Sequence, residues 1–245
     1  MSPEHTAYEW NGLRKLWHLF GCLLMVGIFY LWKDIRRPIS GLDFLVIFGW
    51  AETAVAFSID LMRFYSPRVN KVIRGLPFYG NLMRPIEHAH FNAMTYYLLA
   101  ATILMTAYRV GWCREATLVM AIAVLGVADP AAAWTRYQMA KRGWGREQAV
   151  GLLAFFVSSV LVMWAISRRL QCPLHWDHIL GIGFIVALVE SYTKYWVHHL
   201  HPVTRRVQRK IFHRATVWLF RLYPDDNLLI PLTVAVMIGI VSLVM

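Results

Sequence analysis

The stretch "YPDDNLLIPLTVAVMIGIVSLVM", residues 223–245, joins two acids and an amide directly to a long apolar run. No charged side chain follows Asn227 in this run. Because roughly 18 or more consecutive apolar residues mark a membrane-spanning helix, the stretch predicts a transmembrane helix that begins with carboxylates. It therefore places the chain in the membrane class and raises the question of what the acids do there.

The composition of the whole chain supports a membrane protein. Hydrophobic residues make up 58% of the 245 residues and charged residues 16%, whereas soluble domains carry about 25% charged residues. The formal charge of +11 falls mainly in the connections between apolar runs, which indicates anionic lipid headgroups or a phosphorylated substrate and not nucleic acid. We expect no cleaved signal peptide, because the first apolar run leads into charged residues without a small-residue cleavage pattern.

The apolar runs predict an all-α, polytopic membrane bundle that forms one domain over residues 1–245. No hydrophilic stretch is long enough for a separate soluble domain of ordinary size. Seven spans are expected, at roughly 15–32, 41–62, 91–109, 116–135, 148–167, 176–197 and 227–245.

Most of the 25 Lys and Arg residues lie in the N-terminal tail and in the second, fourth and sixth connections. By the positive-inside rule these segments are cytoplasmic. This orientation brings polar residues from several spans to the cytoplasmic mouth of the bundle: Arg14, Lys15, His18, Asp60, Arg63, Arg84, Glu87, Asp129, Glu190, Lys194, Asp226 and Asn227. Since charged groups at membrane depth are costly and usually functional, their convergence predicts a cytoplasmic site at the membrane surface.

The acids before the last span have two interpretations. Asp225, Asp226 or Asn227 can cap a helix by accepting from its first free amides. Alternatively, Pro231 cannot donate to the carbonyl four residues earlier, and the resulting group of oxygens suits a hard cation such as magnesium. Both interpretations stay open on the sequence alone.

The segment "VLGVADPAAAW" predicts a second interruption. Pro130 removes a hydrogen bond to Gly126 and biases Asp129 away from helical geometry, and interrupted helices in membranes usually line a cavity. A plain helix end with an interfacial Asp129 is the alternative.

The other polar motifs also have ordinary explanations. Arg84 and Glu87 can pair on one helix face, and Arg14 and Lys15 can anchor the first span at the interface. The histidines of "KYWVHHLH" are expected to be interfacial and not a zinc site. Residues 202–222 predict a basic amphipathic helix on the cytoplasmic interface.

The cysteines Cys113 and Cys172 fall in expected outer connections. A disulfide between them is an open alternative, but two free thiols are expected. The third cysteine, Cys22, shares no metal-binding spacing with them.

The order of the motifs resembles the CTP-dependent lipid kinases, which include diacylglycerol, dolichol and phytol kinases and are related to phosphatidate cytidylyltransferases. The resemblance rests on "RKLWH", "DLMRFYSPRVN", "LMRPIEHAHFNAMTYYLLA", "GVADPAAA", "GLLAFFVSS", "VES" and "DNLLIPL". The chain departs from the family at "WTRYQMAKRGWG", where a glycine-rich basic segment is usual and Lys141 supplies a cation instead.

The resemblance implies CTP-dependent phosphorylation of a lipid alcohol, with diacylglycerol as the first acceptor and a polyprenol as the second. Phosphoryl transfer needs cations, a metal and a proton acceptor. The candidate phosphate ligands are Arg14, Lys15, His18, Arg63, Arg84 and Lys141. The candidate magnesium ligands are Asp129, Asp226 and Asn227. Asp129 or Glu87 would accept the proton, with Asp60, Glu190 and Lys194 in support.

Two other functions stay open. A cytidylyltransferase would make a CDP-linked lipid from phosphatidate, and a non-catalytic relative or lipid transporter would turn over neither substrate. As an integral membrane protein, the chain is expected in the cytoplasmic membrane of a bacterium or in the endoplasmic reticulum of a eukaryote, with its N-terminus in the cytosol.

Overall fold

The computed structural model describes residues 11–36, 38–84, 87, 90–144, 147–172, 174–195 and 225–244. Within these ranges the regular structure is helical and contains no strand, which confirms the all-α class. The helices are α1 (Gly12–Trp32), α2 (Gly41–Tyr65), α3 (Pro67–Gly75), α4 (Pro77–Leu82), α5 (Ala93–Arg109), α6 (Glu115–Lys141), α7 (Glu147–Arg169), α8 (Trp176–Tyr195) and α10 (Asp226–Val244).

A described helix overlaps each range that the sequence predicts as a span. Five of the described helices, α1, α2, α6, α7 and α10, are long and apolar enough to cross a membrane. This is the property expected of an integral membrane protein. The predicted amphipathic helix at 202–222 and the three histidines near residue 200 lie outside the described residues.

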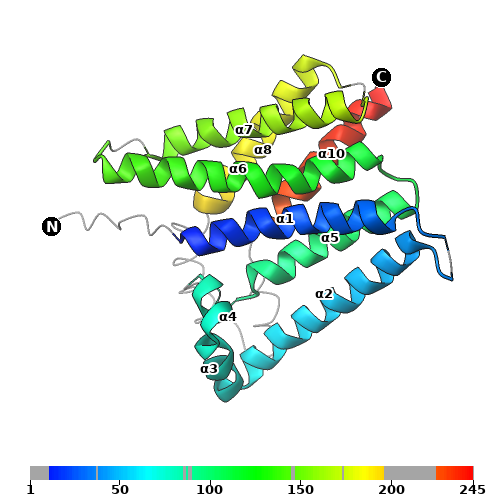
Figure 1. Ribbon diagram of the computed structural model, residues 1–245. Coiled ribbons are helices and arrows are strands. Elements are labelled where there is room, and N and C mark those ends of the chain that lie inside the picture. The colour runs from blue at the N-terminus through cyan, green and yellow to red at the C-terminus, as the bar shows by residue number, and fades with distance from the viewer. Residues whose placement is uncertain are drawn as a thin grey trace, which may run out of the picture.

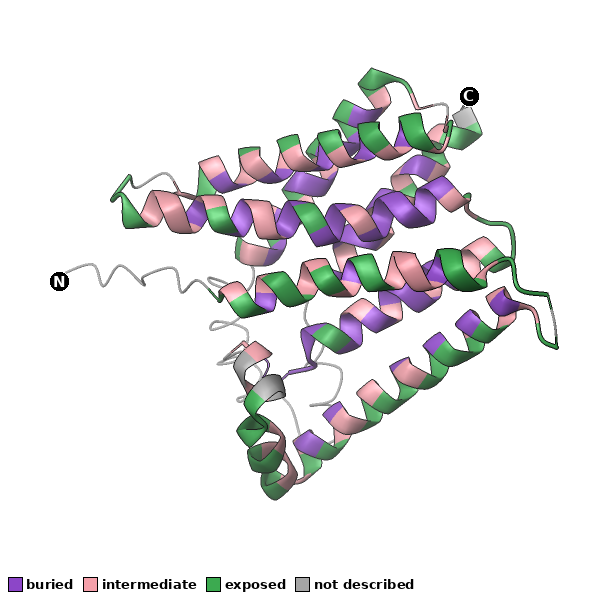
Figure 2. Cartoon of the chain, viewed as in Figure 1, coloured by how far each residue is buried: buried purple, intermediate pink, exposed green. Residues whose placement is uncertain are grey.

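Helix α6 forms the centre of the bundle. It packs against α1, α7 and α10 (Figure 1) and is the most buried of the long helices (Figure 2). Small residues allow the close approach: a Cβ at Gly126 would lie 2.5 Å from the Cβ of Cys22 on α1. Small residues at helix interfaces permit such close packing in membranes.

Helix α2 lies at the edge of the bundle. It packs on α5, and its axis diverges from that of α1 toward the end of the bundle where α3 and α4 lie (Figure 1). Thr53 and Thr102 join α2 to α5 by a hydroxyl–hydroxyl hydrogen bond of 3.2 Å, and Gly49 contacts Thr102. Most of the apolar side chains on α1 and α2 are exposed, as lipid contact requires.

The predicted interruption at Pro130 is wrong, because α6 continues through it as one helix to Lys141. Proline removes one backbone donor, but the flanking Ala128, Ala132 and Ala133 are fully buried in continuous helix packing. Pro231 likewise lies inside the continuous helix α10. Neither proline ends a helix here.

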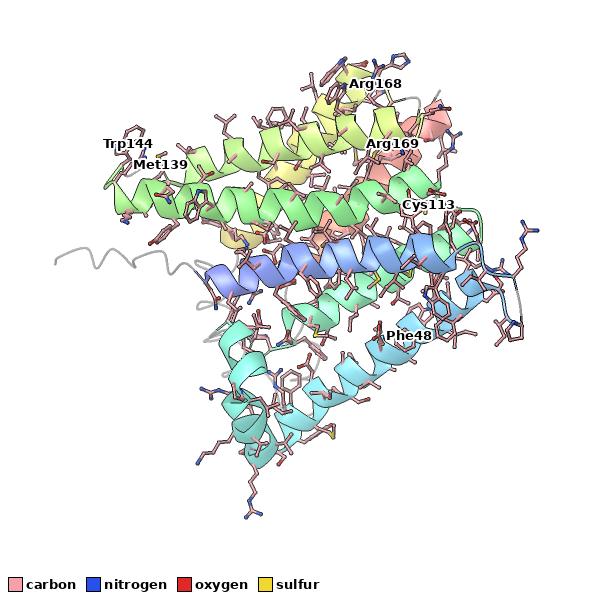
Figure 3. All side chains as sticks on the ribbon, in the orientation of Figure 1. Phe48, Cys113, Met139, Trp144, Arg168 and Arg169 are labelled. Carbon is pink, nitrogen blue, oxygen red and sulfur yellow. The ribbon has the colours of Figure 1, made fainter. Side chains whose placement is uncertain are left out.

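The two ends of the bundle differ in their side chains. Figure 3 shows Met139 and Trp144 at one end and Cys113, Arg168 and Arg169 at the other. We call the first the charged end, because α1 and α10 begin there, α2 and α8 finish there, and their polar side chains meet there. All three cysteines are free thiols, so the expectation that Cys113 and Cys172 are not bonded to each other is confirmed.

Candidate active site

The first turns of α1 direct three cationic or titratable side chains into the bundle, those of Arg14, Lys15 and His18. The Asn11 side chain caps the helix by accepting from the Arg14 amide at 3.0 Å. Arg14 is buried and donates to Glu87 at 2.8 Å and to the Leu82 carbonyl at 3.1 Å. Lys15 donates to Asp129 at 2.5 Å. A simple interfacial anchor would leave these side chains in water, so anchoring does not account for them.

Asp129 lies at the centre of the site. It is fully buried on α6, and its carboxylate lies 3.6 Å from the Lys194 ammonium and 3.5 Å from Nδ1 of His18. Three helices, α1, α6 and α8, therefore converge on one carboxylate. The sequence identified all of these residues but could not show that they touch.

The start of α10 satisfies the capping interpretation. Asp225 accepts from the backbone amide of Asn227 at 2.9 Å and from its side-chain amide at 2.6 Å. Asp226 makes a different set of contacts: it accepts from Arg84 at 3.1 Å and forms a closer ion pair with Lys194. Asp225 thus caps the helix through one carboxylate oxygen, and its other oxygen lies 3.7 Å from Arg84, so both acids take part in the site.

Arg136 is a site residue that the sequence analysis missed. It lies on α6, is 2% exposed, and donates to Glu190 on α8 at 2.8 Å. Gly151 on α7 makes room for it, since a Cβ there would lie 2.4 Å from both Cγ and Nε of Arg136. Because Arg136 follows Asp129 by seven residues, or two helical turns, the shared helix face was the available signal.

Together these residues form one connected set of opposite charges, which we call the charge network. Its cations are Arg14, Lys15, Arg84, Arg136 and Lys194, and its carboxylates are Glu87, Asp129, Glu190, Asp225 and Asp226. Replacing buried ion pairs by apolar residues is often neutral or stabilising, so stability alone does not explain such a network. Buried charges at membrane depth indicate a functional site.

Asp60 and Arg63 form a separate buried pair at 2.5 Å. Arg63 also donates to the carbonyls of Glu87 at 2.5 Å and His90 at 3.4 Å. The Arg63 guanidinium is thus hydrogen-bonded to the backbone of the segment that contains Glu87, whose side chain belongs to the charge network. In this arrangement the pair positions that segment.

Lys141 stands apart from the charge network. It is exposed at the end of α6, twelve residues beyond Asp129, which corresponds to about 18 Å along a helix. Figure 1 shows that this end of α6 extends past the start of α1. The structure therefore does not bring Lys141 to Asp129.

The predicted magnesium ligands are only partly arranged for a metal. Asp129 and Asp226 lie on either side of the Lys194 ammonium, so one cation already bridges them. Asn227 directs its amide nitrogen toward Asp225 and Asp226. Within the described residues, no group of three His, Cys, Asp or Glu side chains could hold a metal ion. Both carboxylates could act as oxygen ligands once Lys194 moved away, so magnesium binding by Asp129, Asp226 and Asn227 stays a prediction.

A largely apolar cavity of about 240 Å³ opens beside the charge network, between α1, α2 and α5. We call it the lipid-facing cavity, because α1 and α2 form its outer walls. Arg14, His18, Asn92 and Asn227 line one part, which we call its mouth. Apolar side chains such as Ile28, Leu45 and Phe48, the last labelled in Figure 3, line the remainder.

Comparison with known protein families, curated proteins and solved structures finds no match to this chain. The function must therefore be argued from the site itself. Its two parts are a charge network suited to an anionic ligand and an adjacent cavity suited to a hydrocarbon chain. His18 belongs to both, since it lines the cavity and lies 3.5 Å from Asp129.

Proposed function

We propose that this protein is a CTP-dependent kinase of membrane lipid alcohols, with diacylglycerol as the first acceptor and a polyprenol as the second. The observation that carries the proposal is the contact of His18 with both the lipid-facing cavity and Asp129. A hydroxyl group at the cavity mouth would thus meet a titratable pair beside a cluster of cations. The order of the sequence motifs, which resembles the CTP-dependent lipid kinases, supplies the nucleotide and the reaction class.

The proposal also gives the chain an orientation. All seven long helices cross the bilayer, and the charged end faces the cytosol, where CTP is found. The positive-inside rule supports this direction. The protein would lie in the cytoplasmic membrane of a bacterium or in the endoplasmic reticulum of a eukaryote, with the basic segment 202–222 on anionic headgroups.

The cations of the network would bind the triphosphate. Arg14, Lys15 and Arg84 are held by carboxylates, which fixes their side chains in place before the nucleotide arrives. Preorganised cations stabilise the charge of a transferring phosphoryl group. Lys141, on the extension of α6, would contact a more distant part of the nucleotide.

Magnesium is the metal that this chemistry requires, and Asp129 with Asp226 would hold it. Bound there, it would neutralise phosphate charge. Lys194 contacts both carboxylates, so its ammonium must move when a divalent cation binds. Glu190 lies 4.0 Å from Lys194 and would receive it.

The chain's own residues account for the proton. The lipid oxygen forms a bond to the terminal phosphorus of CTP, the bond from that phosphorus to the CDP oxygen breaks, and the hydroxyl proton passes to His18 or directly to Asp129. General bases of this kind contribute roughly 10² to 10⁴ in rate. Glu87 is the less suitable acceptor, because Arg14 already binds its carboxylate at 2.8 Å.

The test is an assay in membranes with CTP labelled either in the terminal phosphate or in the nucleoside, offered with diacylglycerol, a polyprenol or phosphatidate. We expect terminal label in the lipid alcohol, and a fall of about 10² or more in Asp129→Asn and Asp226→Asn. Asp43→Asn is the matched control, because it removes a carboxylate from an exposed pair with Arg109 outside the site.

Other outcomes would assign a different function. Nucleoside label in phosphatidate would replace the kinase with a cytidylyltransferase. Absence of turnover and of nucleotide binding with every lipid would leave a non-catalytic relative or transporter. Undiminished transfer in both aspartate variants would contradict the roles given to these residues.

A further inference from the structure

Helix α3 (Pro67–Gly75) and the residue that ends it carry an apolar face that the bundle covers only in part. Apolar residues recur there at i, i+3, i+4 and i+7, the spacing of one helix face, and they are Val69, Val72, Ile73 and Leu76. Val69 and Ile73 are half-buried, whereas Val72 is 66% exposed and Leu76 is 48% exposed. Within the described chain, Val72 and Leu76 therefore lie largely outside protein packing.

A second face of α3 is basic. Arg68, Lys71 and Arg74 follow one another at intervals of three residues, and all three are exposed. Residues 61–84 contain no Asp or Glu, so no carboxylate of the same segment can neutralise them. A helix with one apolar and one cationic face is typical of helices that lie in the membrane interface, where the cations contact anionic headgroups.

The end of α2 places α3 at the depth of the interface. The 25 residues of α2 extend about 37 Å, slightly more than the roughly 30 Å hydrocarbon core. Tyr65, the last residue of α2, is exposed, and tyrosine is typical of the boundary between lipid and water. Ser66 then caps α3 by accepting from the amide of Val69 at 3.3 Å. The chain therefore starts a new helix where α2 leaves the hydrocarbon core.

The direction of α3 also suits the interface. Figure 1 shows that α3 and α4 follow one another across the charged end and not along α1. Helix α4 contacts α1, and the carbonyl of its last residue, Leu82, accepts from Arg14 at 3.1 Å. The segment formed by α3 and α4 is thus attached to α2 at one end and to α1 at the other, which holds α3 at the level of the charged end.

We propose that α3 lies in the plane of the membrane interface, with Val72 and Leu76 against the lipid chains and with its three cations bound to the headgroups of anionic phospholipids. Each Lys or Arg near an anionic membrane surface increases binding about fivefold. Charge favours lipid over a second copy of this chain, because two copies of α3 would bring like charges together without a carboxylate between them. The inference does not depend on the proposed reaction.

The depth of α3 can be measured in the full-length chain, made cysteine-free and reconstituted into nanodiscs of phosphatidylcholine and phosphatidylglycerol. A fluorophore is attached to Val72→Cys or to Arg74→Cys, two residues further on and about 200° round the helix. Phosphatidylcholine with a nitroxide in its acyl chain is the quencher. We expect quenching roughly threefold stronger or more at Val72, because opposite sides of a helix differ in depth by about 10 Å.

Two results would overturn the lipid contact. Equal quenching at the two positions would show that α3 does not direct its apolar face into the bilayer. Absence of quenching at both, together with a disulfide between two chains through Val72→Cys, would assign this face to a second copy.

The preference for anionic lipid is measured with the label at Val72 and the nitroxide on either phosphatidylglycerol or phosphatidylcholine. We expect phosphatidylglycerol to quench about fivefold more strongly or more, and the two lipids to quench alike once Arg68, Lys71 and Arg74 are all replaced by Gln. The matched control is Arg168→Gln with Arg169→Gln, which removes exposed cations from the opposite end and should leave the preference unchanged. Equal quenching by the two lipids before any of these cations is replaced would overturn the binding of anionic headgroups.

Discussion

Asp60 illustrates how a single buried carboxylate can organise a loop. It accepts from the Asn92 amide at 2.9 Å, from Thr95 Oγ1 at 2.6 Å and from Arg63 at 2.5 Å. Arg63 in turn holds the carbonyls of Glu87 and His90. The segment that leads into α5, and with it Glu87, therefore depends on Asp60.

We predict that Asp60→Ala lowers the free energy of unfolding by about 3–5 kcal/mol, because it leaves Arg63 buried without its carboxylate. Thermal unfolding of the purified protein in detergent measures this. The control is Asp43→Asn, which removes a carboxylate from an exposed pair and should leave the melting temperature unchanged. Equal melting temperatures for the two variants would show that the Asp60 pair is not structural.

Cys113 permits a second prediction, on reactivity. It lies in the connection between α5 and α6, where burial raises its pKa to about 11. Only the thiolate is nucleophilic, so alkylation of Cys113 should be slow at pH 8 and should accelerate as the pH rises toward 11. Mass spectrometry of alkylated protein gives the rate, with a small-molecule thiol as reference. Alkylation at the reference rate at pH 8 would contradict the raised pKa.

At the scale of elements, the contact between α6 and α7 positions Arg136. The Arg136 side chain occupies the space that a side chain at Gly151 would need. Arg136 donates to Glu190, and Glu190 lies beside Lys194. Lys194 in turn lies between Asp129 and Asp226. The distance between α6 and α7 therefore affects the position of Arg136 and, through Glu190 and Lys194, the centre of the charge network.

We predict that Gly151→Ala displaces Arg136 and lowers the free energy of unfolding by about 1–3 kcal/mol through overpacking. We also expect it to raise the activation free energy of lipid phosphorylation by at least the same amount. The matched control is Gly181→Ala on α8, where a Cβ meets no atom within 4 Å and alanine favours the helix. Thermal unfolding and the phosphate-transfer assay on both variants provide the comparison. Full activity in Gly151→Ala would separate Arg136 from the reaction.

At the scale of the whole molecule, the two ends of the bundle should lie on opposite sides of the membrane. Met139 and Trp144 lie at the charged end, and Arg168 lies at the other (Figure 3). In a cysteine-free background, we predict that Met139→Cys and Trp144→Cys react with an impermeant maleimide only from the cytosolic side. Arg168→Cys should react only from the opposite side. The reverse pattern would invert the proposed orientation, and reaction of all three from one side would contradict it.

The sequence by itself determined the all-α class, the approximate ranges of the seven long helices and most residues of the charge network. Apolar runs of this length and isolated charges within them are local properties, and the cost of exposing backbone groups to lipid leaves helices as the solution for such runs. The capping role of Asp225 was equally local, since it depends on an amide two residues away.

The tertiary structure alone decided which of these charges touch. Arg136 was missed and Lys141 was included because distance along the chain does not report which helix face meets α7 and α8. The predicted break at Pro130 failed for a related reason: close packing of the alanines around it keeps α6 continuous. The lipid-facing cavity also depends on how far α2 diverges from α1, and that angle is set by packing between helices, which no local pattern encodes.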